Sequence, residues 1–131
     1  MNNELFGQPY DTSDPYWIVK GYFDVMYNNG RFIDAIEHIS RKVGFSTDGA
    51  YCHFPDMNSY YEENHFTGIM FIYGYLDSDE VIVGDETGYY FIKQACELYL
   101  KHHQADKVKI GEILSNVLKW DSLNHLRQSQ I

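Results

Sequence analysis

The sequence predicts an α+β fold in which a small antiparallel sheet is flanked by helices, in the order α-α-β-β-β-α-α. Apolar residues at helical spacing fill the first and the last third of the chain. Between them, two short apolar runs are separated by the turn sequence Asp77-Ser78-Asp79. A chain of 131 residues is long enough to bury one core, so we predict a single domain over residues 1–131.

The first predicted helix follows an irregular arm over residues 1–12. Ser13 or Asp14 can cap this helix, and Pro15 suits its first turn, where a missing N–H costs no hydrogen bond. Residues 28–30 end it, because Asn and Gly tolerate a left-handed backbone. Apolar residues at positions i, i+4, i+7 and i+8 mark its buried face: Ile18, Tyr22, Val25 and Met26.

A second helix is predicted to follow with little linker and to end at Gly44. The short connection favours an antiparallel pair of helices. The apolar residues of this second helix also repeat at helical spacing: Phe32, Ile33, Ile36, Ile39 and Val43.

Three strands are predicted next. Residues 50–54 alternate in polarity, which places Tyr51 and His53 on one face and the smaller or apolar side chains on the other. Residues 66–76 are apolar on both faces, which suggests a central strand that is covered on both sides, or by helices on one side and a partner on the other. After the turn, residues 80–83 return as the third, antiparallel strand.

The last two predicted helices begin at acidic residues. Asp85 can cap the third helix, and Asp106 can cap the fourth. The pattern fades after Trp120, which predicts a frayed tail over residues 121–131. The buried stripes of these helices are Ile92, Ala95, Cys96 and Tyr99 in the third and Ile110, Ile113, Leu114, Val117 and Leu118 in the fourth.

Charge is distributed unevenly along the chain. Residues 43–92 contain nine of the 19 acidic residues and neither Lys nor Arg. The other ten acids balance the ten bases, so the formal charge of −9 arises entirely in this block. Such a block repels nucleic acid, which is bound through Lys and Arg, and attracts a basic protein surface. We therefore expect a protein partner and no nucleic-acid partner.

A nuclease is one class of protein with a basic surface, because its active site must hold phosphates. An inhibitor that places carboxylates there repeats the charge of the substrate backbone and speeds encounter. Tyr adds a large ring with a polar tip, which suits an interface. The alternative for each candidate is a solvated rim position or, for the Tyr pair, a place in the core. The predicted partner-binding residues are Tyr60, Tyr61, Glu62, Glu63, Asp77, Asp79, Glu80, Asp85 and Glu86.

No pattern in the sequence points to catalysis. Cys52 and His53 lack the spacing of a metal site or a nucleophile pair, and the paired acids are sequence neighbours whose side chains point apart. We expect no catalytic residue, no metal and no cofactor. The two cysteines are predicted to be reduced and buried. The start of the chain lacks a secretory signal, and no apolar run approaches the ~20 residues of a membrane helix, so a cytoplasmic location is expected.

Several segments together resemble a known family. They are residues 22–27, 30–36, 43–45, 48–55 and 80–100. The resemblance is to the immunity proteins of bacterial contact-dependent growth inhibition systems, in the group paired with ribonuclease toxins. It covers roughly residues 18–115 and implies a small cytoplasmic protein that binds and inactivates a toxin domain delivered by a neighbouring cell. Because such pairs are specific for their own toxin, the resemblance carries no interface residues to this chain.

Three hypotheses follow from these observations. The first is an immunity protein that neutralises a cognate ribonuclease toxin domain through an acidic, Tyr-containing surface. The second is a generic acidic protein-interaction module, and the third is a small acid/base enzyme that uses carboxylates. Protection of a cell that expresses the toxin domain separates the first from the other two. The oligomeric state is left open by the sequence.

Overall fold

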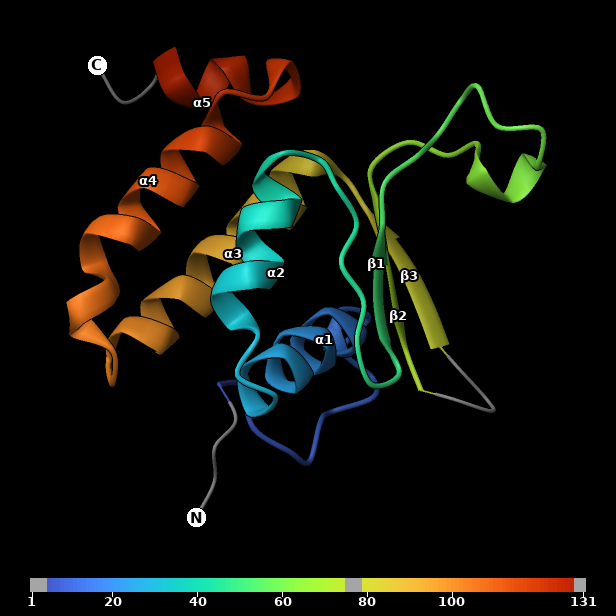
Figure 1. Ribbon diagram of the computed structural model, residues 1–131. Coiled ribbons are helices and arrows are strands. Elements are labelled where there is room, and N and C mark those ends of the chain that lie inside the picture. Colours follow the sequence, from blue (N-terminus) through green and yellow to red (C-terminus); the bar gives the residue numbers. More distant parts are fainter. Residues whose placement is uncertain (1–4, 75–78, 129–131) are drawn as a thin grey trace.

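The computed structural model of the protein describes residues 5–74 and 79–128 and confirms the predicted α+β class and element order. Figure 1 shows the α-helices gathered on one side of a three-stranded sheet. The described residues also form short 3-10 helices and a further C-terminal helix. The elements are α1 Trp17–Asn28, α2 Phe32–Ser40, β1 Ala50–His53, η1 Glu62–Asn64, β2 Ile69–Tyr73, β3 Asp79–Val83, α3 Asp85–Leu100, η2 Gln104–Asp106, α4 Lys107–Leu118, η3 Asp121–Leu123 and α5 Asn124–Gln128.

The sheet is antiparallel throughout, in the order β1-β2-β3, so the predicted central position of the second strand is confirmed. In its middle row, Cys52 lies opposite Phe71, which lies opposite Val81. This row faces α1, the helix that packs across all three strands. The alternate rows face the other way and form what we call the outer sheet face: Tyr51, His53, Met70, Ile72, Glu80 and Ile82.

The core lies between the inner side of the sheet and α1. Tyr22, Phe23 and Phe71 are fully buried there, with ring centroids 5.2 to 6.0 Å apart. Such a close approach of helix to sheet needs a small residue. A Cβ added at Gly21 would lie 2.8 Å from the ring of Tyr73, so glycine is what lets α1 settle on β2.

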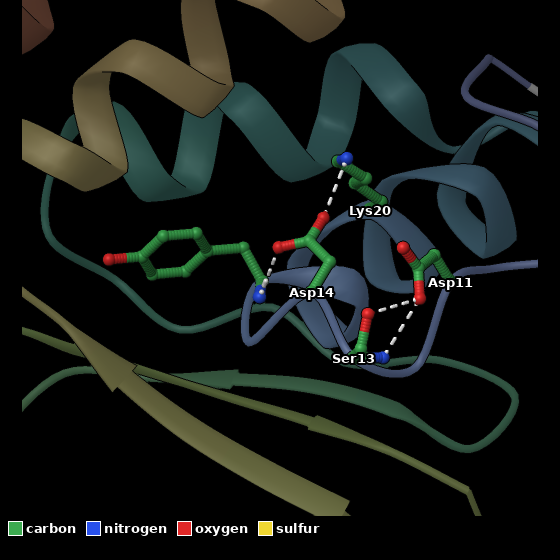
Figure 2. Close-up of polar contacts among 5 residues, drawn as sticks. Asp11, Ser13, Asp14 and Lys20 are labelled. Carbon is green, nitrogen blue, oxygen red and sulfur yellow. Dashed lines mark hydrogen bonds and ion pairs between the residues drawn. The ribbon is translucent and has the colours of Figure 1, made fainter.

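The start of α1 differs from the prediction. Tyr16 is the N-cap residue, and no side chain caps the helix. Figure 2 shows the contacts that engage Ser13 and Asp14 instead. The Ser13 hydroxyl and N–H donate to Asp11, at 2.5 and 3.0 Å, and lower the pKa of that carboxyl. Asp14 binds Lys20 at 2.8 Å and the Tyr16 N–H, and these contacts lower its pKa.

The end of α2 also corrects the sequence-based pattern. The helix stops at Ser40, and Val43 is exposed rather than part of the buried stripe. Lys42 adopts a left-handed backbone, with φ 58°, and the Val43 N–H donates to the His38 carbonyl at 2.9 Å. These are features of a Schellman C-terminus, in which the chain leaves the helix axis. Val43 therefore lies past the end of the helix.

The predicted caps of the last two long helices act differently from expectation. Gly84, rather than Asp85, is the N-cap residue of α3. Asp106 does occupy the N-cap position of α4, but its side chain does not cap the helix. Its carboxylate accepts a hydrogen bond from the Tyr99 hydroxyl at 2.6 Å instead, and so ties α4 to the end of α3.

The C-terminal residues are more ordered than the predicted frayed tail. Residues 121–128 form η3 and α5, and Leu123 is fully buried. Trp120, also buried, donates its indole N–H to the Ser40 carbonyl at 2.9 Å. Trp120 and Leu123 thus hold against the core a segment that lacks a helical apolar repeat. Its last three residues lie outside the described part of the chain.

The N-terminal arm is held from residue 5 by one buried carboxylate on α1. Asp24 is almost fully buried and accepts four hydrogen bonds. The N–H groups of Leu5, Phe6 and Gly7 donate to it at 2.7 to 3.0 Å, and the Tyr10 hydroxyl donates at 2.5 Å. The Asp24 carboxylate thus accepts the backbone hydrogen bonds that regular secondary structure would otherwise accept in this arm.

Both cysteines are free and buried, as predicted. Burial raises the pKa of Cys96 to about 12 and that of Cys52 still further, so neither thiol ionises near neutral pH. We expect neither to react with Ellman's reagent at pH 8 until the protein is unfolded. Above pH ~8.5, only the unfolded state loses these protons, so the free energy of unfolding should fall by about 1.4 kcal/mol per pH unit for each thiol.

Urea titrations between pH 8 and 10 measure this slope. A Cys96→Ala variant should lose about half of it while its remaining thiol stays unreactive in the folded state. Rapid labelling of the folded protein at pH 8, or stability that does not change over this range, would contradict the assignment.

Candidate functional site

The predicted Tyr and Glu pairs lie together on a projecting loop. Tyr60 is 92% exposed and Tyr61 60% exposed, and their rings meet edge to face with centroids 5.5 Å apart. Glu62 and Glu63 follow directly in η1 and are both exposed. We call residues 60–63 the acidic tip. Figure 1 shows η1 on the side of the sheet away from the helices. The alternative that the Tyr pair closes the core is wrong.

The loop that carries the acidic tip is closed by its own polar groups. The Asp56 N–H donates to the Asn64 carbonyl at 2.8 Å, which joins the two ends of the loop. Within it, the Asn64 side chain donates to the Ser59 hydroxyl at 2.8 Å, and a ring nitrogen of His65 lies 2.7 Å from the Ser59 carbonyl. Because these polar groups bond to one another, the loop closes without a contribution from either Tyr ring, and both rings face solvent.

A second pair of predicted acids lies at the opposite end of the sheet. In the register of the sheet, Asp79 lies opposite Tyr73 and Glu80 opposite Ile72, at the end of the sheet where β1 begins. The acidic tip lies beyond the other end, after β1 has ended at His53. Asp79 and Glu80 are both exposed. Asp77, the remaining predicted acid of this turn, lies outside the described residues. The antiparallel hairpin thus separates two groups of acids that are close in sequence.

The last two predicted acids are engaged by the C-terminal segment and by Lys42, just past the end of α2. Asp85 lies 3.3 Å from the Lys42 ammonium and accepts a hydrogen bond from the Ser122 hydroxyl at 2.6 Å. Glu86 lies 3.2 Å from a ring nitrogen of His125. Both acids occupy the first turn of α3, where the helix dipole favours an anion. Their role in the fold is therefore to join α3 to the segments around it.

The outer sheet face contains only one of the predicted partner-binding residues, Glu80. Tyr51 is 37% exposed and Ile82 45% exposed, and Met70 and Ile72 lie between them, partly exposed. These side chains stand outside the core cluster, whereas Val81 and Tyr73 on the inner side pack against it. The alternation of residues 50–54 did place Tyr51 and His53 away from the core. Residues 66–76 are apolar on both faces, so the sequence left open whether the side of this strand away from the helices is covered by the chain itself or by a partner.

Neither a metal site nor a thiolate nucleophile is found among the described residues. Within residues 5–74 and 79–128, no three His, Cys, Asp or Glu side chains are grouped so that they could hold a metal ion. Cys52 is protonated and enclosed, so a pairing with His53 would hold no thiolate. Of the helices in this part of the chain, none is long and apolar enough to cross a bilayer.

Comparison with known proteins identifies the family. The chain is similar in structure to an immunity protein from Neisseria meningitidis MC58, with a TM-score of 0.71 and 17% sequence identity over 88% of this chain and 99% of that one. No curated protein matches the chain. The family model of CDI immunity proteins matches residues 15–114, which is most of the sequence. This chain therefore belongs to the CDI immunity protein family.

Proposed function

We propose that the protein neutralises a cognate ribonuclease toxin domain in the cytoplasm by presenting an acidic, Tyr-containing surface to the basic face of the nuclease. Membership of the CDI immunity family makes the protein an inhibitor rather than an enzyme and its partner a protein toxin. The resemblance of the sequence to the group paired with ribonuclease toxins supports a nuclease as that toxin.

The exposure and charge of the acidic tip carry this proposal. Two Tyr rings and two carboxylates project into solvent, and neither Glu62 nor Glu63 forms an ion pair within the described residues. The whole of residues 43–92 supplies no Lys or Arg to neutralise them. Uncompensated carboxylates attract a cationic surface over a Debye length of ~10 Å, and exposed Tyr residues can then anchor the complex.

The other predicted acids have secondary roles in the proposed surface. Asp77, Asp79 and Glu80 would extend it along the sheet, away from the acidic tip. Asp85 and Glu86 would lie at its periphery, because Lys42 and His125 already engage them. The acidic tip is therefore the part of the surface to test first.

Reversing the charge of the acidic tip should abolish protection. A Glu62→Lys, Glu63→Lys variant places two ammonium groups against the basic toxin surface and should weaken binding about 100-fold. The measurement is survival of cells that express the cognate toxin domain, together with the dissociation constant of the purified pair. For the wild-type protein, the association rate should fall at least about tenfold from low to physiological salt.

The matched control reverses two exposed acids outside the base-free block, Glu97→Lys and Glu112→Lys. It changes the net charge by the same amount but should keep binding within about threefold of the wild-type protein. If both double variants protect cells equally, the acidic tip is not the contact. If the wild-type protein itself fails to protect, the proposed function is wrong.

A further inference from the structure

One face of the sheet has no helix against it within the described residues. Figure 1 shows the helices on the opposite side, and α1 makes the main contact with the strands there. The outer sheet face forms two rows across the strands. Tyr51, Ile72 and Glu80 make the first row, and His53, Met70 and Ile82 the second.

The composition of this face differs from that of a solvated sheet. An antiparallel sheet that meets water normally alternates apolar residues inward with polar residues outward. Here four of the six outward positions are Tyr, Ile or Met, and they are neighbours in the register. Isolated apolar residues on a surface carry no meaning, but a contiguous group indicates a face that meets another protein.

We propose that the outer sheet face is the apolar centre of the toxin interface and that the acidic tip lies at its rim. This inference rests on the proposed function and adds to it the surface on which the toxin sits. Continuity supports it, because β1 contributes Tyr51 and His53 to the face and then leads into the loop that carries the tip. Both features lie on the side of the sheet away from the helices (Figure 1).

Charge decides between a toxin and a second copy of this chain as the occupant. The only carboxylate of the face is Glu80, and neither the strands nor the acidic tip contains Lys or Arg. Two copies joined through this face would bring two base-free acidic surfaces together, which like-charge repulsion opposes. A cationic protein surface would instead bring positive charges against Glu80 and the acidic tip.

The area of the outer sheet face is large enough for the centre of an interface but too small for a complete interface. Three strands about 4.8 Å apart and five residues of about 3.3 Å each give roughly 240 Å². A stable interface buries about 800 Å² on each partner, and its few dominant residues lie at the centre, enclosed by a polar rim. The face therefore needs the loop with the acidic tip to complete the contact area.

An Ile82→Lys variant tests the inference. It places a charge in the centre of the proposed interface, at a side chain exposed enough to accept it without loss of folding. Binding to the cognate toxin domain should weaken by at least about 30-fold in calorimetric titration. Val108→Lys is the matched control, because Val108 is 75% exposed on α4 and receives the same charge. This control should bind within about twofold of wild type.

Tyr51→Lys provides a second test from a different strand and should weaken binding to a similar extent. Thermal unfolding followed by circular dichroism checks that each variant is folded. If the wild-type protein binds the toxin but both face variants bind equally well, the inference is overturned and the proposed function stands. If the wild-type protein does not bind, both are overturned. A wild-type dimer that Ile82→Lys dissociates in sedimentation would identify a second copy as the occupant and overturn the inference.

Discussion

Replacing Asp24 with alanine should release the N-terminal arm and lower the free energy of unfolding by about 3 kcal/mol or more. The carboxylate accepts hydrogen bonds from three backbone N–H groups and the Tyr10 hydroxyl in a buried position. Its removal leaves these donors without an acceptor, and each unsatisfied buried donor costs about 1–3 kcal/mol. The arm limits the loss by moving out to water, and the variant should therefore show rapid amide exchange at residues 5–7.

Two further variants make the Asp24 prediction specific. Asp24→Asn keeps one acceptor oxygen but turns an NH₂ group toward N–H donors, so an intermediate loss is expected. Asp34→Ala removes an exposed carboxylate that pairs only at the surface with Arg31, and it should change stability by less than about 1 kcal/mol. Urea unfolding and hydrogen exchange measure these effects. An Asp24→Ala protein with wild-type stability and a protected arm would contradict the assigned role.

Replacing Trp120 with alanine should destabilise the protein by about 4 kcal/mol. The indole is buried, lies edge-on to Phe54 with centroids 5.9 Å apart, and carries the Lys42 ammonium 5.0 Å from its ring centroid. Its N–H also satisfies the Ser40 carbonyl at the end of α2. The substitution thus removes a large apolar contact and a buried hydrogen bond at the junction of α2 with the C-terminal segment.

Phenylalanine separates these two contributions. Trp120→Phe keeps an aromatic ring but loses the indole donor and some volume, so a loss of about 1–2 kcal/mol is expected. Tyr90→Ala removes an exposed ring from α3 and should cost less than about 1 kcal/mol. Chemical denaturation followed by far-ultraviolet circular dichroism gives all three values. Equal losses for Trp120→Ala and Tyr90→Ala would show that Trp120 does not anchor the C-terminal segment.

Local periodicity accounts for the parts of the fold that the sequence predicted correctly. Helical spacing and strand alternation depend only on neighbouring residues, and these patterns located the long helices and the three strands in their observed order. The departures involve contacts between distant residues. Asp24 binds an arm up to 19 positions away, and Trp120 reaches Ser40 across 80 positions, and neither pairing leaves a periodic signal.

The charge pattern located a region but not a surface. It pointed to residues 60–63, which lie exposed in one loop; their role in binding stays a prediction. It could not show that Asp85 meets Lys42, 43 positions away, or that the hairpin carries Asp79 and Glu80 to the far end of the sheet. The outer sheet face also required the register of three strands, since its apolar residues come from three separate segments.

The two tryptophans give the protein a pair of local optical reporters. Trp17 lies between Tyr10 of the arm and Tyr73 of the sheet, with ring centroids 6.1 and 5.8 Å apart, whereas Trp120 lies beside the C-terminal segment. In a Trp120→Phe background, a red shift of the emission on heating would report water reaching the arm. In a Trp17→Phe background, the same shift would report separation of the C-terminal segment. Fluorescence of the two backgrounds therefore reveals which chain end melts first.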